Sequence, residues 1–180
     1  MALEHALLVS LAERAGAGME LTRRFDASIG FFWQATHQQI YKVLARMQER
    51  DWLSSQVVAQ ADGPDTKVYV VTPAGHAELR RWLAEPTAPL AARSDLAVRL
   101  RGASYAADRT AILDDVRRLI ADHLARRELY QQLCARDYPE PAELTGQDLD
   151  HYLVLRGGLR LEQFWIDWLT EYLTAHTAKE

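Results

Sequence analysis

The sequence predicts a mainly α-helical fold with a small β-hairpin wing, namely a winged helix-turn-helix followed by a helical dimerisation domain. Three observations indicate it. Apolar residues recur at helical spacing through residue 50, the stretch between residues 55 and 71 is rich in β-branched and aromatic residues, and helical spacing returns after residue 72. Beyond two prolines at positions 86 and 89, the periodicity is helical alone. We therefore expect two domains.

The composition is that of an ordinary globular protein, with 180 residues and 48% hydrophobic content. The single cysteine, Cys134, leaves no disulfide framework, and residues 1–5 lack the basic start and apolar run of a signal peptide. No apolar stretch approaches the roughly 20 residues that a membrane-spanning helix needs. These features predict a cytoplasmic protein with no membrane span.

The charge is unevenly placed along the chain. Residues 1–84 carry nine basic and nine acidic side chains, so the net charge of −4 comes entirely from residues 85–180. Because the chain as a whole would repel nucleic acid, any DNA-binding surface has to be local, and we expect it in the N-terminal half.

Three helices are expected at the start of the chain. The first is marked by leucines 3, 7, 8 and 11, and two glycines, Gly16 and Gly18, separate it from a short segment over residues 19–25. The third begins after Thr36, whose hydroxyl can accept hydrogen bonds from free backbone N–H groups. Asp51 is expected to end this helix, since Asp tolerates left-handed dihedral angles. Its predicted buried face comprises Ile40, Val43, Leu44 and Met47.

A hairpin and a closing helix are expected next. Val57 and Val58 precede a turn-forming cluster at residues 62–65, and a second strand follows over residues 67–71. Thr72 and Pro73 then supply a cap and a first-turn proline for an amphipathic helix. Its predicted apolar face comprises Ala77, Leu79, Trp82 and Leu83. This order predicts a winged helix-turn-helix DNA-binding domain over residues 1–84 and a linker over residues 85–91.

Residues 92–180 are predicted to form a helical dimerisation domain. One long helix is expected beyond Asp108, ended by two prolines at 139 and 141, and another over residues 145–175. The first of them contains a repeat with alternating steps of three and four, although its polar members make it an imperfect heptad. The members are Leu113, Val116, Ile120, His123, Arg127, Tyr130 and Cys134. The last helix carries Trp165, Trp168 and Tyr172. Two helices with this much aromatic surface cannot bury it alone, so a partner chain is expected.

Polar residues at the start of the third helix are the candidate DNA-reading group. A helix-turn-helix points this turn at base edges, and glutamine suits bidentate pairing with adenine. The alternative is an ordinary solvated first turn. The candidates are Thr36, His37, Gln38, Gln39, Tyr41 and Lys42.

Three further cations are candidates for contacts with the DNA backbone. Lys67, just after the predicted turn, is placed to reach a phosphate, although a solvated lysine at a hairpin tip is the alternative. Arg23 and Arg24 in the preceding helix are the others. Four aromatic residues, Trp33, Tyr41, Tyr69 and Trp82, are expected to be core rather than base-stacking groups.

No catalytic, metal or cofactor site is predicted. Asp114 and Asp115 are adjacent, so on a helix they point about 100° apart and cannot act together as acid and base. His123 and Arg127 lack further metal ligands at a recognisable spacing. Cys134 fits a helix face as a small apolar residue, and the Gly157–Gly158 pair is best explained by close helix packing or a kink.

Four motifs in the first half resemble the PadR family of transcriptional regulators. They are Gly18-Met19-Glu20-Leu21, Gly30-Phe31-Phe32-Trp33, His37-Gln38-Gln39-Ile40-Tyr41, and Tyr69-Val70-Val71-Thr72-Pro73-Ala74-Gly75. Three positions depart from the usual family pattern. Met19 stands where tyrosine is usual, Lys42 where many members have proline, and Asp51-Trp52 replaces glycine-leucine.

The stretch from Arg156 to Leu169 resembles the helical C-terminal domain of PadR members related to virulence-gene activators. The resemblance implies a homodimeric repressor on a palindromic double-stranded DNA operator, with release by a small hydrophobic or phenolic effector in some members. An effector pocket would lie between the domains or at the dimer centre, with Trp165 and Trp168 as aromatic walls; the alternative is that they form dimer core. A winged-helix adaptor that binds protein instead of DNA is the competing hypothesis, because residues 1–84 are neutral.

Overall fold

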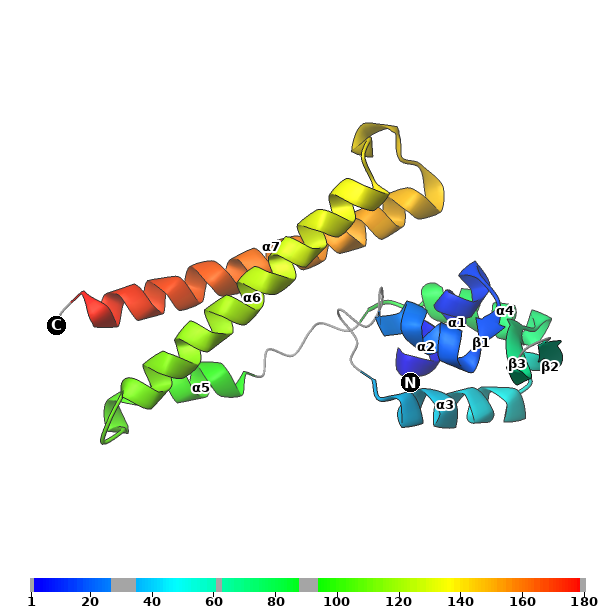
Figure 1. Ribbon diagram of the computed structural model, residues 1–180, viewed down its shortest axis with the longest axis horizontal. Helices are drawn as coiled ribbons and strands as arrows, with labels where there is room; N and C mark the ends of the chain where they lie inside the picture. Colours follow the sequence, from blue (N-terminus) through cyan, green and yellow to red (C-terminus); the bar gives the residue numbers. More distant parts are fainter. Residues whose placement is uncertain (1, 27–34, 61–62, 88–93, 179–180) are drawn as a thin grey trace. The chain divides into compact units, whose positions relative to one another are not determined.

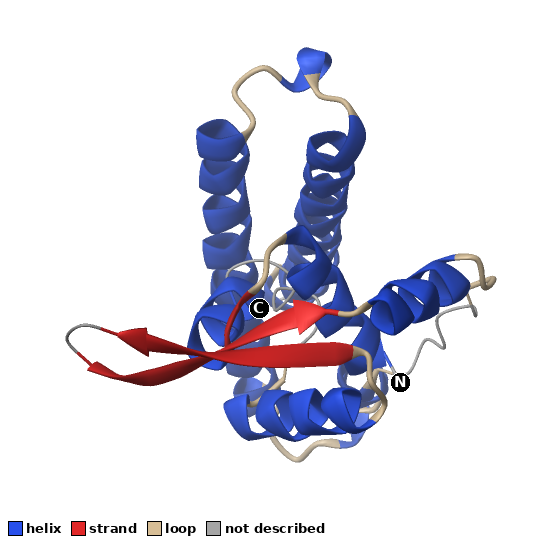
Figure 2. Cartoon of the chain, turned by 90° about the vertical axis from the view of Figure 1, so that its right-hand side faces the viewer, coloured by secondary structure: helices blue, strands red, loops and turns tan. Residues whose placement is uncertain are grey.

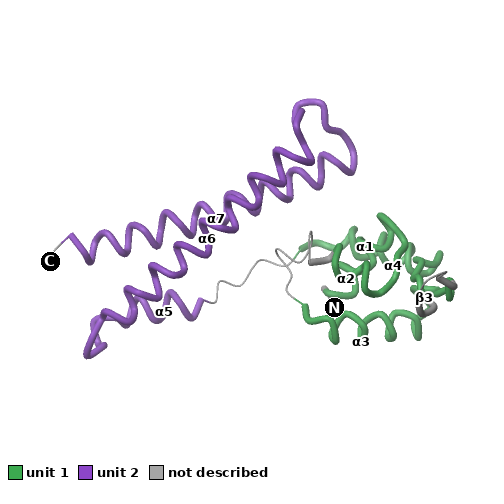
Figure 3. The backbone as a smooth tube through the Cα atoms, viewed as in Figure 1, with its two compact units in different colours: residues 1–89 green, residues 90–180 purple. Residues whose placement is uncertain are grey.

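The computed structural model describes residues 2–26, 35–60, 63–87 and 94–178 (Figure 1). The chain divides into two compact units, residues 1–89 and 90–180 (Figure 3). The Gly30–Trp33 motif, and with it the prediction for Trp33, lies outside the described residues, as does most of the predicted linker.

The first unit contains helices around a small antiparallel sheet (Figure 2). The prediction of a mainly helical fold with a wing is confirmed. Its elements are α1 (Ala2–Glu13), β1 (Gly16–Ala17), α2 (Gly18–Asp26), α3 (His37–Glu49), β2 (Leu53–Gln60), β3 (Gly63–Val71) and α4 (Pro73–Leu83).

The core of this unit is formed by apolar side chains from α1, α2, α3, α4 and the sheet. The predicted inward face of α3 is confirmed, since Ile40, Val43, Leu44 and Met47 are all buried. Asp51 adopts the left-handed conformation expected of it, with φ of 57°. This turn sends the chain from α3 directly into β2.

The sheet has three strands in the order β1-β3-β2, one more than the predicted hairpin. β1 is only two residues long, and Gly16 pairs with Tyr69 of β3. Two residues are too few to show the alternation by which a strand is recognised in a sequence. The predicted turn at residues 62–65 is also wrong, because β3 already begins at Gly63. Lys67 consequently pairs with Val57 inside the wing and is not at its tip.

Helix α4 begins as predicted, with the Thr72 hydroxyl accepting from the Gly75 N–H at 3.0 Å and Pro73 in the first turn. Its buried face differs from the prediction, because Ala77 and Leu83 are exposed whereas Gly75 and Leu79 are buried. The reason is a close approach of backbones: a Cβ on Gly75 would lie 2.2 Å from the Trp52 carbonyl oxygen. The helix therefore turns the Gly75 side of its surface toward the sheet.

The second unit is built on two long helices, α6 (Thr110–Asp137) and α7 (Gly146–Thr177), joined by a turn that contains the 3-10 helix η3 (Pro141–Glu143). A short helix, α5 (Asp95–Arg101), precedes them and was not predicted; the 3-10 helix η2 (Ala103–Tyr105) follows it. Leu100 of α5 packs with Val116 of α6 and Leu169 of α7 in a second core.

Helices α6 and α7 pack along the predicted face of α6, where Val116 and Tyr130 are buried. Close helix packing, rather than a kink, accounts for Gly158, because a Cβ there would lie 3.1 Å from the Tyr130 ring. Glu162 is buried in the same seam, where it contacts His123 Nδ1 at 2.5 Å and accepts from Arg126 Nε at 3.3 Å.

No helix among the described residues is long and apolar enough to cross a membrane. Within the described parts of the chain, no three His, Cys, Asp or Glu side chains are grouped so that they would hold a metal ion.

Candidate nucleic-acid interface

The first turn of α3 is closed by a reciprocal capping box. Thr36 Oγ1 accepts from the Gln39 N–H at 3.3 Å, and Gln39 Oε1 accepts from the Thr36 N–H at 2.8 Å. This pair satisfies backbone donors at the helix start and holds the turn in one conformation. One of the two lone pairs of the Gln39 amide oxygen is therefore used at the cap.

An exposed stripe runs along the side of α3 that faces away from the core. Gln38, Lys42, Ala45 and Glu49 follow one another at helical spacing, and His37 lies beside Gln38 in the same first turn. The stripe begins with side chains that donate or accept hydrogen bonds. Ala45 adds no bulk at its centre, so the backbone of α3 can approach a groove closely.

Tyr41 lies at the edge of this stripe and is 44% exposed, which corrects the prediction that it is core. Tyr69 is buried and Trp82 packs against the core as predicted. Tyr41 stands against the start of α2, where a Cβ on Gly18 would lie 2.6 Å from its ring. The phenol therefore depends on the glycine in the Gly18-Met19 motif for its position.

Lys67 of β3 is joined to the C-terminal end of α3. Its Nζ donates to Gln48 Oε1 at 2.8 Å, and Gln48 Nε2 donates in turn to Ser55 Oγ of β2 at 3.0 Å. The ammonium group also lies 5.3 Å from the centre of the Tyr69 ring. Gln48 thus connects Lys67 of the wing to α3.

The two predicted arginines of α2 differ in their surroundings. Arg23 is exposed, with its Nη2 3.8 Å from the Met19 sulfur. Arg24 is partly buried against β1, and this burial, together with the charge of Arg14, lowers the pKa of its guanidinium. Arg23 is therefore the better placed of the two to contact a phosphate.

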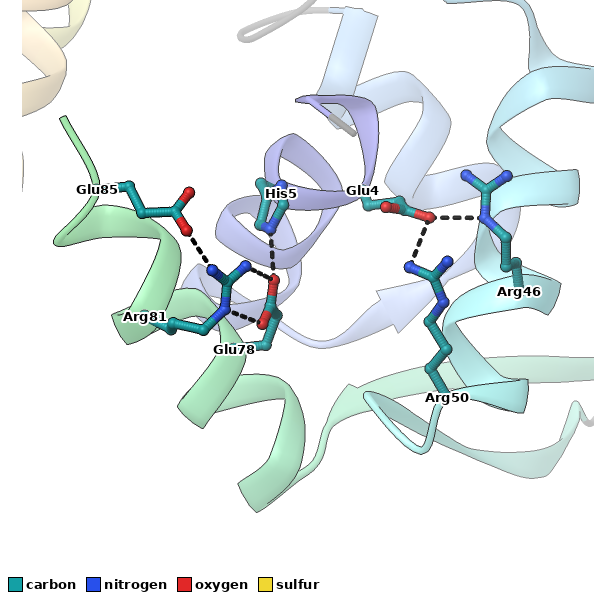
Figure 4. A network of polar contacts seen from close by, with 7 residues as sticks. All are labelled: Glu4, His5, Arg46, Arg50, Glu78, Arg81 and Glu85. Atoms are coloured by element: carbon teal, nitrogen blue, oxygen red, sulfur yellow. Dashed lines mark hydrogen bonds and ion pairs between the residues drawn. The ribbon is translucent and has the colours of Figure 1, made fainter. Parts of the chain in front are cut away.

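Two adjacent residues of α1, Glu4 and His5, connect this helix to α3 and α4 (Figure 4). Glu4 Oε1 accepts from Arg46 Nε at 2.6 Å and from Arg50 Nη1 at 3.3 Å. This network was not predicted from the sequence. The sequence indicates the network only in that two ionisable residues interrupt the apolar start of the first helix. Both residues are 3% exposed in the fold.

His5 contacts α4 in two ways. Its Nε2 lies 2.9 Å from Glu78 Oε1, and its ring stacks on Trp82 at a centroid distance of 4.6 Å. Arg81 donates to both oxygens of Glu78 at 2.7 Å and also pairs with Glu85. Hydrogen bonds from Arg81 and then from His5 lower the pKa of Glu78 from 4.5 to about 2.

This shift predicts a dependence of stability on pH. Because the pKa of Glu78 is lower in the folded state, its carboxylate stabilises the fold above pH 4.5, and this stabilisation is lost as the pH falls toward 2. We expect the free energy of unfolding of Glu78→Gln to fall less steeply than that of the wild type over this range, measured by denaturant unfolding at several pH values. Glu85→Gln is the control, since that carboxylate is exposed. Parallel pH profiles for wild type and Glu78→Gln would contradict the assignment.

The C-terminal aromatic residues predicted as effector walls or dimer core are partly buried within their own unit. Trp165 stacks on His123 at 5.7 Å, whereas Trp168 and Tyr172 pack against the core formed by α5, α6 and α7. Tyr172 also donates its hydroxyl to the Leu100 carbonyl at 3.3 Å. These contacts give each ring a partner inside one chain.

Comparison with known families gives a match for each unit. Residues 7–81 match the PadR-like family of transcriptional regulators, and residues 92–177 match the C-terminal domain of virulence activator alpha.

Three relatives are similar over almost their whole length. A probable transcriptional regulator of Mycobacterium tuberculosis is 45% identical over 97% of both chains. The virulence activator AphA of Vibrio cholerae superposes with a TM-score of 0.81 at 31% identity, over 99% of both chains. The negative transcriptional regulator PadR of Bacillus subtilis is 27% identical over 95% of both chains.

The Bacillus subtilis protein has also been solved with operator DNA and with p-coumaric acid. The DNA complex superposes with a TM-score of 0.82 at 24% identity, over 97% of this chain and 99% of that one. At this identity the likeness establishes a shared fold.

Proposed function

The chain belongs to the PadR-like family of DNA-binding transcriptional regulators and carries their virulence-activator type of C-terminal domain, and we propose that it is a sequence-specific repressor that binds a palindromic operator as a homodimer. Membership of this family also means that the chain is not an enzyme. The proposal of sequence-specific operator binding rests on the exposed stripe of α3, which begins in a rigidly capped turn.

In the proposed complex, the start of α3 lies in the major groove. Gln38 and His37 face the base edges, and Gln38 is the glutamine whose side chain is not needed for the capping box. Gln39 and Thr36 instead hold the turn. Lys42, Lys67, Arg23 and the Tyr41 hydroxyl contact phosphates, where they position the protein without reading sequence.

The direction of regulation is proposed from the relative named a negative transcriptional regulator. A repressor of this kind occupies its operator and is released by an effector. Because that relative has been solved with p-coumaric acid, a phenolic acid is the first effector to add to the DNA-binding assay.

The homodimer proposal is supported by a second apolar seam on α7, which we call the outer seam. It comprises Val154, Gly157, Leu161 and Phe164. These residues recur at alternating steps of three and four, as the residues facing α6 do, and a Cβ on Gly157 would have nothing within 4 Å. Leu161 and Phe164 are each 55% exposed in the single chain. A second copy of the chain, packed along this seam, would bury them.

A mobility-shift assay with DNA from upstream of the chain's own gene tests the proposal. We expect Lys42→Ala and Lys67→Ala to weaken binding to operator and unrelated DNA alike. Each phosphate contact that is removed should reduce the slope of log K against log salt by about 0.9. The three cations Lys42, Lys67 and Arg23 of both subunits together account for about −5 of the wild-type slope. Gln38→Ala should instead lose roughly 1–3 kcal/mol of discrimination between operator and altered bases.

Arg80→Ala, an exposed substitution on α4 with the same change of charge, is the matched control. Unchanged affinity in both lysine variants would show that the docking geometry is wrong. If the wild type gives no salt-dependent shift at all, the chain is instead a winged-helix protein adaptor.

A further inference from the structure

Three cations follow one another along one side of α3 at intervals of one turn. Lys42, Arg46 and Arg50 are spaced four residues apart, so neighbouring side chains lie one above the other. Four residues advance a helix by slightly more than one turn, and the row therefore drifts from the exposed stripe at Lys42 toward α1 at Arg50. We call these residues the basic row.

The inner ends of the two arginines are held by one buried carboxylate. The Glu4 side chain is 4% exposed, and its Oε1 accepts from both guanidinium groups at 2.6 and 3.3 Å (Figure 4). A buried carboxylate is costly unless it is paired, and one partner would satisfy that requirement. Two arginines around one acid leave the cluster with a net positive charge.

The outer parts of both arginines face solvent. Their side chains are 43% and 48% exposed. Arg46 donates to Glu4 through Nε. Most of the N–H donors of a guanidinium are on its two terminal nitrogens, and this contact does not use them. Arg50 is further constrained by the Trp52 ring, 5.1 Å from its Cζ. Each guanidinium is thus fixed on one side and open to solvent on the other.

We propose that Arg46 and Arg50 are DNA-backbone contacts of α3 and that Glu4 is the residue that positions them. This inference rests on the proposed DNA-binding function and extends it to a second flank of the helix, opposite the wing. A guanidinium held in one orientation can present two N–H groups to a phosphate, and the entropy of ordering it has already been lost in folding. The neutral total charge of residues 1–84 is then compatible with DNA binding, because four of their nine cations, Lys42, Arg46, Arg50 and Lys67, lie on or beside α3.

The test measures binding of the full chain to a mixed-sequence DNA duplex over a range of salt concentrations. Arg46→Gln and Arg50→Gln are each expected to weaken binding about tenfold, as the loss of a charged hydrogen bond would. Each should also reduce the salt slope by about 0.9 per bound subunit. Arg80→Gln on α4 is the control of equal charge and should leave both quantities unchanged.

Two variants test the role of Glu4. Glu4→Gln keeps the side-chain volume and both cations, so we expect the salt slope to stay the same while affinity falls. Arg46→Lys keeps the charge but lacks the Nε that Glu4 holds, and it should likewise retain the slope and lose affinity. If circular dichroism shows that Glu4→Gln does not fold, Arg46→Lys alone tests the positioning role of Glu4.

The outcomes separate this inference from the function on which it rests. If the wild type binds and Lys42→Ala weakens binding, but both arginine variants match Arg80→Gln, then the arginines only tie α1 to α3 and the inference fails alone. Tighter binding by Glu4→Gln would overturn the positioning role, because Glu4 would then mask the arginines. Absence of wild-type binding to any duplex would remove the DNA-binding function itself.

Discussion

Replacing Gly75 by alanine is expected to destabilise the winged unit by about 3 kcal/mol or more, at or above the upper end of the cost of overpacking. The added Cβ would lie 2.2 Å from the Trp52 carbonyl oxygen and 2.8 Å from Val71 Cγ1. That carbonyl also accepts the Thr72 N–H at 3.0 Å, so it cannot move away without breaking the bond that joins the chain after α3 to the start of α4. Since a domain is stable by only about 5–15 kcal/mol, much of the unit's stability would be lost.

The measurement is denaturant unfolding followed by tryptophan fluorescence, because Trp52 and Trp82 both pack against this core. Ala77→Gly on the exposed face of α4 is the matched control, and it should cost only about 1 kcal/mol through helix propensity. A Gly75→Ala variant as stable as Ala77→Gly would mean that α4 does not approach the Trp52 backbone this closely.

Replacing Leu161 by aspartate is expected to convert the protein to a monomer. A charge in the outer seam would have to be buried without a partner when the second copy packs there. A monomer engages one half-site of a palindromic operator, so operator affinity should fall by roughly 10²-fold or more through the loss of bivalent binding. Sedimentation and the mobility-shift assay measure the two effects separately.

Thr170→Asp introduces the same charge on the opposite side of α7, at another exposed position, and is the control. It should leave the oligomeric state unchanged. A Leu161→Asp protein that remains a dimer with full operator affinity would place the dimer interface elsewhere on the second unit.

The elements predicted with the right boundaries are those with strong local signals. The capped start at Thr36, the four buried residues of α3 and the left-handed Asp51 all follow from interactions within one turn of the helix. The length of α6 follows in the same way from an imperfect heptad repeat and two prolines. Such features are read correctly because the physical cause lies close to the residue in the chain.

The errors share the opposite property. β1 exists because two residues meet β3 some fifty positions away in the sequence, and the wing is longer than predicted because pairing with β2 extends β3 to Gly63. Tyr41 looked apolar enough for the core, yet α2 leaves it at the surface beside Gly18. In each case the partner, and not the residue itself, decides the outcome.

By itself, the sequence determined the order of the main helices and of the two wing strands, the inward face of the recognition helix and the residues at its start, because helix capping and hydrophobic periodicity act over a few residues. Only the tertiary structure decided how the cations on and beside that helix are held. It joined Lys67 to Gln48, and Arg46 and Arg50 to Glu4. Side-chain hydrogen bonds between distant segments form only once the core has brought those segments together, and no local pattern in the chain encodes them.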